Sequence, residues 1–523
     1  MTLAFKELLG NVPMAADLYD AVRRGRPQTR YNLEQLDSHL STAVEQTRPF
    51  AERAKPGKKL LLFGTLHYWI EQAAMVGLAL RGLGHSVTIA YLPFGSYDKK
   101  INAFDLRRQE LYTRRVLAPL TGLIRTVSLF EVDPAERLPS ELESAVQNAA
   151  AFDTMYTLQV EDFDRQSPLY QLRIERDHAA ALQALSLLQS EKPDAVLIPN
   201  GLVTELGVFY QVARHLDLMT VTYEFNDQRE QVWLSQNEIV MRQQIDDLWK
   251  ARGSRPLNDD EREKIAGLEE ARTSARKYGK GTRFWQDVTS VGGEQLRKTL
   301  KLDERPIVLL PSNVLGDTLT LGRNIFTASM AEWIDKTVRY FAARKDVQLV
   351  VRIHPGERLM KGPSMQGVIE KAVPERPEYI HVIGPMEKIN TYDVMEIASL
   401  GLAYTTTVGL EMAMRGAPVI VAGNTHYRGR GFTHEPASWE EYFALLEKIL
   451  ANLPAYRLGP EQIETAWNYA YRFFFDFPLN FPWRLMHFWN DVDTWPLKRV
   501  LSDEGQKEFG QTFRYLAGEK INW

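Results

Sequence analysis

A run of three threonines in the second half of the chain could bind an anion. Thr405, Thr406 and Thr407 lie between an apolar segment and a segment of helical spacing at 408–415. Their hydroxyl groups and the free backbone N–H groups would stand at the start of a helix, where the helix dipole also favours negative charge. Gly409 would let the backbone or a ligand approach closely. The pattern predicts a phosphate site and suggests a nucleotide as its ligand, although simple helix capping explains the same residues.

A histidine at the end of another apolar segment is a second candidate for this site. His354 and Pro355 directly follow 348–353, which has the composition of a buried strand. Since parallel strands end at one edge of a sheet, we expect the imidazole on the threonine side. There it could donate to a phosphate or to a departing oxygen, while the proline fixes the loop. A structural role at the end of a strand is the alternative.

Three further polar residues fall near the predicted phosphate site. Ser312 and Asn313 follow the apolar segment 306–311, and they suit a loop near a sugar or phosphate, as they suit many turns. Glu411 lies one turn into the helix after the threonines. Its carboxylate could accept hydrogen bonds from ribose hydroxyls, or it could simply complement the positive end of the helix dipole.

A polar loop at 424–434 gathers cations and hydrogen-bond donors, with Gly429 and Gly431 between them. An anionic sugar or a phosphate would suit such a loop. A solvated surface loop is the alternative. The candidate residues for contact with a donor sugar or an acceptor are His426, Tyr427, Arg428 and Arg430.

The first half of the chain offers two candidate catalytic groups. His67 follows the first apolar strand of the chain, and Glu224 ends a later one. Either could act as a general base or bind an acceptor at the carboxyl edge of a sheet. An ordinary structural role is the alternative for each.

Two series of strands and helices must position these residues. Short apolar segments alternate with segments of helical spacing, an order that favours parallel sheets. Ligands of such sheets bind beyond the carboxyl ends of the strands, where the polar residues fall. The expected strands are 59–64, 86–92, 194–199 and 219–224 in the first half, and 306–311, 348–353, 380–383, 400–404 and 418–422 in the second. The predicted fold class is α/β, with two Rossmann-like domains facing across a cleft.

We predict four parts along the chain. A helical preface covers 1–55, a Rossmann-like domain with a helical insertion or linker covers 56–300, a second such domain covers 301–455, and an aromatic helical tail covers 456–523. The tail is expected to pack back on the N-terminal domain. Its alternative is contact with a membrane surface, where Trp and Phe beside Arg are common.

Composition and charge argue against several classes of function. A net charge of -4 over 523 residues is nearly neutral, which argues against nucleic acid as the main partner. The absence of cysteine excludes disulfides and Cys-ligated metals. No cluster of His, Asp and Glu has a convincing metal spacing, so no metal is expected. No segment approaches the roughly 20 apolar residues of a membrane span, and no secretion signal is evident, so we expect a cytoplasmic protein.

The second half resembles the capsule polysaccharide synthesis family that includes bacterial β-Kdo transferases. The motifs that match are RIHPGE at 352–357, TTTVGLEMAMRGAPVIVAG at 405–423 and YRGRGFTH at 427–434. The resemblance covers about 305–450 and is absent from the preface and the tail. It implies a GT-B glycosyltransferase that uses a sugar donor, with a CMP-linked acidic sugar favoured, and needs no metal or other cofactor.

The resemblance also implies roles for individual residues. His354 and the threonines 405–407 would hold the nucleotide phosphate, and Glu411 would approach the ribose. The resemblance does not mark an acidic residue in the N-terminal half, and we choose Glu224 as the catalytic carboxylate from its place at the end of a predicted strand. The C-terminal domain would then bind the nucleotide sugar and the N-terminal domain the acceptor.

We therefore expect a glycosyltransferase that moves a sugar, such as Kdo, onto a glycan or lipid-linked acceptor in the synthesis of capsule or another surface polysaccharide. It would lie in the cytoplasm or on the inner face of the membrane, with polysaccharide export or assembly proteins as further partners and no nucleic acid. Two alternatives stay open. One is a UDP-sugar transferase or epimerase on the same fold, and the other is a non-catalytic scaffold for polysaccharide assembly.

Overall fold

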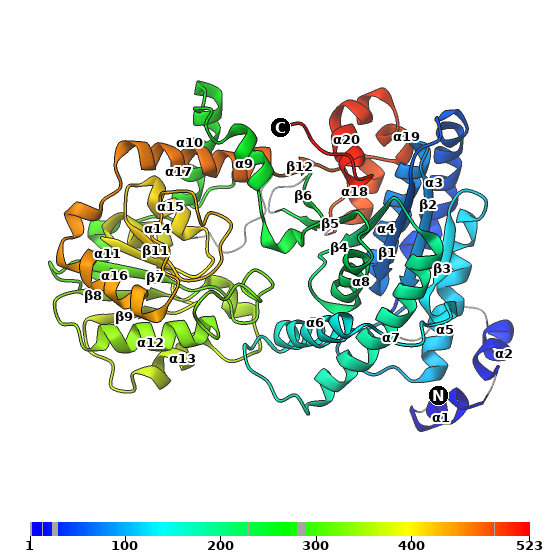
Figure 1. Cartoon of the computed structure of the whole chain (residues 1–523), viewed down its shortest axis with the longest axis horizontal. Helices are drawn as coiled ribbons and strands as arrows, with labels where there is room; N and C mark the ends of the chain where they lie inside the picture. The colour runs from blue at the N-terminus through cyan, green and yellow to red at the C-terminus, as the bar shows by residue number, and fades with distance from the viewer. Residues whose placement is uncertain (1–2, 13, 24–29, 227–229, 280–287, 486) are drawn as a thin grey trace.

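The computed structural model describes residues 3–12, 14–23, 30–226, 230–279, 288–485 and 487–523. Within these residues the chain forms two β-sheets flanked by helices (Figure 1). The larger sheet is built mainly from the first half of the chain, and the smaller one lies wholly in the second half. This arrangement confirms the predicted α/β fold class with two Rossmann-like domains.

The N-terminal sheet has seven strands in the order β12-β6-β5-β4-β1-β2-β3. The strands from β5 to β3 are parallel neighbours, whereas β6 and β12 join antiparallel at one edge. The central strands are buried on both faces, which explains their continuous apolar sequences. The bounds are β1 (Lys59–Thr65), β2 (Ser86–Leu92), β3 (Arg125–Ser128), β4 (Ala195–Pro199), β5 (Thr220–Phe225), β6 (Gln231–Gln236) and β12 (Leu479–Asn480).

Three strands of this sheet, β3, β6 and β12, are absent from the sequence prediction. All three lie towards the edges of the sheet and are only partly buried, so none has the continuous apolar run that marks the central strands. The helices of this half are α1 (Leu3–Gly10), α2 (Ala15–Val22), α3 (Glu34–Arg53), α4 (Leu66–Gly82), α5 (Ala103–Leu117), α6 (Ser140–Leu158), α7 (Pro168–Glu191) and α8 (Thr204–His215).

The C-terminal sheet has five parallel strands in the order β11-β10-β7-β8-β9. The strands are β7 (Ile307–Pro311), β8 (Gln348–Arg352), β9 (Ile380–Ile383), β10 (Leu400–Ala403) and β11 (Val419–Val421). The helices are α12 (Met330–Ala342), α13 (Met365–Ala372), α14 (Thr391–Ile397), α15 (Val408–Met414) and α16 (Trp439–Ala451). Since β7, β8 and β10 are adjacent, their carboxyl ends meet at one edge, which is where the predicted phosphate residues lie.

The helical segment before β7 belongs to the C-terminal domain, which corrects the predicted boundary at residue 300. Ile245, Leu248 and Ile265 are buried in one apolar core with Ile307 and Leu309 of β7. Charged sequence suggested a linker, but the apolar positions between the charges pack against the C-terminal sheet. The helices involved are α9 (Asp246–Arg252), α10 (Asp259–Thr273) and α11 (Gly293–Thr299).

The tail divides between the two domains. Helix α17 (Pro460–Tyr471) packs in the C-terminal core, whereas Trp483 and Phe513 are buried in the N-terminal core. Strand β12 also extends the N-terminal sheet by pairing with β6. The tail ends in α18 (Phe488–Thr494), α19 (Leu497–Val500) and α20 (Asp503–Leu516). Across the described residues, no helix combines the length and apolar character needed to cross a bilayer.

Direct contacts join the two domains. Glu161, just after α6, accepts hydrogen bonds from the backbone N–H groups of Met330 and Ala331 at 3.1 and 2.7 Å, and so caps α12 of the other domain. The segment that follows β7 also reaches across, since Leu321 is buried in the N-terminal core. The carboxyl end of β7 is therefore linked by a short path to the N-terminal domain.

Candidate functional site

Hydrogen bonds between loops bring the predicted phosphate residues together at the edge of the C-terminal sheet. The backbone N–H of His354, after β8, donates to Ser312 Oγ, after β7, at 3.2 Å. The N–H of Thr405, after β10, donates to Asn313 Oδ1 at 3.3 Å. His354 and Ser312 are 42 positions apart in the chain, and Thr405 and Asn313 are 92 positions apart, so distant segments meet at this edge of the sheet. The sequence prediction named all four residues.

The imidazole of His354 has a defined orientation. Its Nδ1 accepts a hydrogen bond from the N–H of Gly356 at 3.0 Å, within the short helical turn Pro355–Leu359. A neutral imidazole whose Nδ1 is an acceptor carries its proton on Nε2. Nε2 is therefore the donor of this side chain, as a phosphate contact requires, and Pro355 begins the turn that fixes the ring.

The three threonines have different roles in the turn. Thr406 Oγ1 accepts a hydrogen bond from the N–H of Val408 at 3.3 Å, and Thr407 makes no side-chain cap. Thr405 Oγ1 is buried and makes no hydrogen bond with any described residue. A buried hydroxyl without a partner is unfavourable unless something else satisfies it. Thr405 therefore has an unused hydrogen-bonding group beside His354 and Asn313.

Gly409 is required for packing, and its contact with a ligand stays a prediction. A Cβ at this position would collide with the hydroxyl of Tyr427 and would lie 3.0 Å from Cβ of Ala403. The prediction chose the right residue for close approach, but the group that approaches is a side chain of the same domain.

Glu411 forms a buried ion pair instead of facing an open site. Its Oε1 accepts from the guanidinium of Arg272 in α10 at 2.5 Å, and both side chains are less than a tenth exposed. The same guanidinium lies 4.2 Å from the ring centre of Phe474. The pair joins α15 to α10, and contact of Glu411 with a ribose stays a prediction.

Part of the loop at 424–434 packs into the domain: His426, Tyr427 and Phe432 are buried, whereas Gly429 and Gly431 are exposed. The His426 ring stacks on Phe473 at 3.8 Å between centres, and its Nδ1 lies 3.1 Å from the Tyr469 hydroxyl. Burial lowers the pKa of His426 far below its ordinary value, so this ring is neutral. Tyr427 donates through its hydroxyl to the carbonyl oxygen of Thr406 at 2.8 Å. Tyr427 therefore supports the threonine turn directly, and His426 packs beside it.

The two arginines of this loop are also held by partners within the chain. Arg428 donates to three carbonyl oxygens, those of Val421, Glu435 and Pro436. Arg430 pairs with Asp246 of α9 and lies over the Tyr469 ring at 5.5 Å. These contacts give the loop a structural role, and its contact with a sugar or phosphate stays a prediction.

Glu224 lies at the carboxyl end of β5 in the N-terminal sheet. Its Oε2 accepts from Asn200 Nδ2 at 3.0 Å, and its Oε1 accepts from the N–H of Phe225 at 3.0 Å. Burial raises the pKa of Glu224, while these two hydrogen bonds oppose the rise. A buried carboxyl group with a raised pKa suits general acid–base chemistry.

His67 lies at the carboxyl end of β1, beside Tyr68, with 5.2 Å between ring centres. Burial lowers the pKa of His67, so the ring is neutral near pH 7. The structure places it on the same sheet edge as Glu224, with β4 between the two strands.

The backbone of this edge is strained at three places. Leu66, Asn200 and Thr204 have φ angles of 61°, 58° and 57°. The left-handed region is unfavourable for residues other than glycine, and most of all for a β-branched one such as Thr204. Strain of this kind concentrates at functional sites, and here it follows directly after β1 and β4.

Tyr68 and Tyr156 lie within electrostatic range of Glu224, and the sequence analysis did not identify them. Burial and the nearby charge of Glu224 raise the pKa of Tyr68. Burial, Asp317 and Glu224 raise the pKa of Tyr156 to about 12. Asp317 lies in the segment after β7, so residues of both domains meet here. The only sequence signal was the position of Tyr68 beside His67 and of Asp317 after the Ser-Asn pair.

Among the described residues, no group of three or more His, Asp or Glu side chains is arranged to hold a metal ion.

Comparison with known proteins identifies the family of the central segment. Residues 264–443 match the family model described as capsule polysaccharide biosynthesis protein. This segment belongs to that family. The match confirms the resemblance predicted from the motifs, and it begins within α10, in line with the corrected domain boundary. We call residues 264–443 the capsule-synthesis segment.

The solved structures that match this chain do so at low sequence identity and low TM-score. A β-Kdo 2,4-transferase, KpsC of Thermosulfurimonas dismutans, is 17% identical, with 53% of this chain and 78% of that chain covered, at a TM-score of 0.34. A β-Kdo 2,7-transferase of the same organism, also KpsC, is 13% identical, with 60% of this chain and 89% of that chain covered, at a TM-score of 0.33. A UDP-GlcNAc 2-epimerase from Neisseria meningitidis is 13% identical, with 79% of this chain and 96% of that chain covered, at a TM-score of 0.26. No curated protein gives a significant match.

The capsule-synthesis segment contains the whole phosphate-site candidate. Ser312, Asn313, His354 and Thr405 all fall within it. Glu224 and the strained sheet edge lie outside, in the N-terminal domain.

Proposed function

We propose that the chain is a glycosyltransferase of capsule or related surface polysaccharide synthesis, which moves a sugar from a nucleotide donor to an acceptor. The observation that supports this most directly is the meeting of three strand ends at Thr405, where a buried hydroxyl beside His354 has no hydrogen-bond partner in the part of the chain that the structure describes. The capsule-synthesis segment supplies the biological setting.

The nucleotide phosphate would lie against this edge of the C-terminal sheet. His354 would donate from Nε2 and Thr405 from Oγ1. Donors fixed before the reaction stabilise the negative charge that develops on the departing phosphate. No metal is needed in this scheme, because the two donors come from the protein.

The acceptor would bind at the carboxyl edge of the N-terminal sheet, with Glu224 as the general base. Its carboxylate would take the proton of the acceptor hydroxyl while that oxygen bonds to the anomeric carbon of the sugar. The bond from that carbon to the phosphate oxygen would break, and the electron pair would leave with the nucleotide. Asn200 and the N–H of Phe225 hold the carboxylate in place.

The donor that we propose is a CMP-linked acidic sugar, on the strength of the family motifs around His354 and the threonine turn. The test is a thermal-shift panel with CMP, UDP, GDP and ADP. We expect CMP to raise the melting temperature and the other three to leave it unchanged. The expected shift disappears in His354→Ala, which should keep the melting temperature of the nucleotide-free protein.

The panel separates the proposal from its alternatives. A shift with UDP alone would replace the CMP donor with a UDP-sugar transferase or epimerase. If none of the four nucleotides changes the melting temperature, the transferase proposal fails in favour of a scaffold. A CMP shift that persists in His354→Ala removes that residue from the phosphate site.

A further inference from the structure

One glutamine of the N-terminal domain contacts the turn of the predicted phosphate site. Gln159 follows the last residue of α6, and its Oε1 accepts hydrogen bonds from the backbone N–H groups of Lys361 and Gly362 at 2.7 and 3.1 Å. Its Nε2 donates to the sulfur of Met360. These three partners directly follow the short helical turn Pro355–Leu359 of the C-terminal domain. A side chain from one domain therefore holds the end of a turn in the other.

This turn is the one that fixes the His354 ring. Met360 closes it, since its N–H donates to the carbonyl oxygen of Glu357 at 2.9 Å. The Glu357 carboxylate accepts from the N–H of Met365 at 3.1 and 3.2 Å. Gly356, inside the turn, donates to His354 Nδ1. Because the loop is bonded within itself in this way, a shift at its end would move the imidazole.

Glycines let the two domains approach closely at this contact. A Cβ on Gly362 would lie 2.7 Å from the carbonyl oxygens of Leu158 and Gln159. A Cβ on Gly316 would lie 2.5 Å from the carbonyl oxygen of Met155, and Gly316 has a φ angle of 68°, which favours glycine. The end of α6 thus packs against two loops of the C-terminal domain, one after β7 and one after β8.

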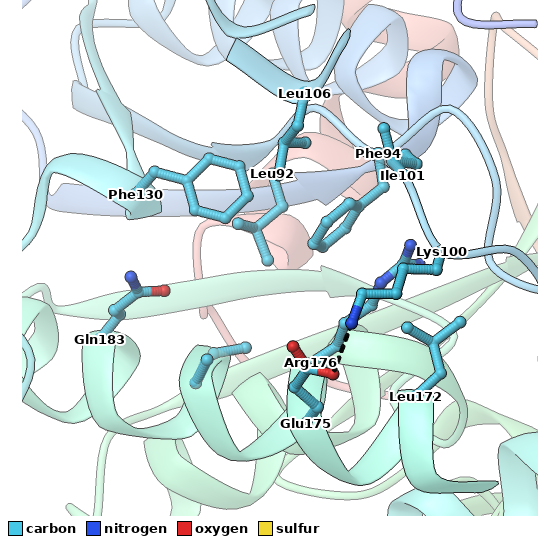
Figure 2. A pocket seen from close by; sticks show the side chains of 12 residues that line it. Leu92, Phe94, Lys100, Ile101, Leu106, Phe130, Leu172, Glu175, Arg176 and Gln183 are labelled. Carbon is cyan, nitrogen blue, oxygen red and sulfur yellow. Dashed lines mark ion pairs between the residues drawn. The ribbon is translucent and has the colours of Figure 1, made fainter. Parts of the chain in front are cut away.

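Helix α6 is itself fixed in the N-terminal domain, on the side that faces the C-terminal domain (Figure 1). Asp153 of α6 pairs with Arg173 of α7, and Arg173 pairs with Glu205 of α8 at 3.0 Å; all three side chains are buried. Three residues further along α7, the guanidinium of Arg176 lies 4.1 Å from the ring centre of Phe94 (Figure 2). Buried charged contacts between three helices therefore set the position of the end of α6.

We propose that Gln159 is a positioning residue for the His354 turn, so that the phosphate contact is complete only when the two domains are together. This inference rests on the proposed transferase function and adds a requirement from the N-terminal domain to the nucleotide site. Glu161, two residues further on, accepts from the N–H groups of Met330 and Ala331 in α12. It joins the same two domains at a different element and gives a matched control.

Amide hydrogen exchange in the nucleotide-free protein tests the contact itself. Gln159→Ala removes the acceptor of the Lys361 and Gly362 N–H groups, so exchange at these residues should become about 5-fold faster, the factor that one ordinary hydrogen bond contributes. Gln159→Glu keeps an acceptor oxygen and should restore slow exchange. Glu161→Ala should speed exchange at the start of α12 and leave Lys361 and Gly362 unchanged.

Calorimetric titration with CMP and with cytidine tests the effect on the phosphate site. Gln159→Ala should weaken CMP binding about 5-fold, as a residue without ligand contact can. Cytidine lacks the phosphate, so its affinity should be the same in wild type and Gln159→Ala. Glu161→Ala should bind CMP as wild type does, and Gln159→Glu should regain most of the affinity.

Three results would overturn the inference: unchanged exchange at Lys361 and Gly362 in Gln159→Ala, faster exchange there with unchanged CMP affinity, or equal losses of affinity for CMP and cytidine. Each of them leaves the transferase proposal in place if wild type binds CMP. A wild-type protein that binds no nucleotide contradicts both the transferase proposal and a role for Gln159 at a phosphate.

Discussion

At the scale of single residues, two adjacent threonines give a test that separates binding from folding. Thr405 Oγ1 makes no hydrogen bond with the described part of the chain, whereas Thr406 Oγ1 accepts one from Val408. We expect Thr405→Val to keep the melting temperature and to weaken CMP binding about 10-fold or more, because a hydrogen bond to a charged group contributes about 1.5–3 kcal/mol. Calorimetric titration with CMP measures the loss.

Thr406→Val is the matched control for this experiment. It removes the acceptor that closes the turn, so it should lower the melting temperature more than Thr405→Val does. If Thr405→Val is the less stable variant and binds CMP as wild type does, its hydroxyl serves the fold and not a ligand.

The ionisation of Glu224 should give the pH profile of kcat/KM an acidic limb, and a substitution beside Glu224 should shift the pH of that limb. Only the carboxylate accepts a proton, and burial raises the pKa of this group, so activity should rise with pH above the ordinary range of glutamate. The Asn200 hydrogen bond favours the carboxylate and lowers that pKa. Asn200→Gly keeps the positive φ but removes the donor, so the limb should move to higher pH.

The pH dependence of kcat/KM, measured with the best donor from the nucleotide panel, checks this shift. If the acidic limb of the profile lies at the same pH in wild type and in Asn200→Gly, then Glu224 is not the general base whose ionisation the profile reports.

At the scale of elements, the ion pair between Glu411 and Arg272 joins α15 to α10. Removing one partner of a buried ion pair costs about 3–5 kcal/mol. We expect Glu411→Gln to lower the free energy of unfolding by up to about 3 kcal/mol, since the amide keeps part of the contact. Urea denaturation measures this loss.

The same variant tests the ribose hypothesis for Glu411. The ratio of affinities for CMP and 2′-deoxy-CMP should be equal in wild type and Glu411→Gln, because the structure assigns the carboxylate to Arg272. A change in this ratio would restore a role for Glu411 at the ribose.

At the scale of the whole molecule, the tail links the two domains by packing on both. Trp483 is fully buried in the N-terminal core and donates from its indole N–H to the carbonyl oxygen of Trp495 at 2.9 Å. We expect Trp483→Ala to cost about 3–5 kcal/mol of unfolding free energy, as the loss of a large buried aromatic side chain does. Urea denaturation followed by tryptophan fluorescence measures this cost.

The control for this prediction is Leu8→Ala, which changes an exposed apolar side chain and should leave stability unchanged. A Trp483→Ala protein as stable as wild type would mean that the tail does not contribute to the N-terminal core in solution.

The sequence predicted the central elements of both sheets because buried parallel strands are continuous apolar runs. The bounds of β1, β2, β4 and β7 lie within a residue or so of the expected segments. The partly buried strands β3 and β6 lack that signal. Helices α9, α10 and α11 were assigned with residues up to 300 to the N-terminal domain, although they pack in the C-terminal core, because charge along a helix hides which of its faces is buried.

What the sequence alone determined is which residues stand at the strand ends, since an apolar run followed by Ser, Thr or His marks the carboxyl edge of a parallel sheet. The tertiary structure decided which of them are available for a ligand. Glu411 pairs with Arg272, Tyr427 fills the space beside Gly409, and the Thr405 hydroxyl has no hydrogen-bond partner among the described residues. The reason is that strand ends follow from local hydrophobicity, whereas hydrogen-bond partners come from segments distant in the chain, and only packing brings those segments together.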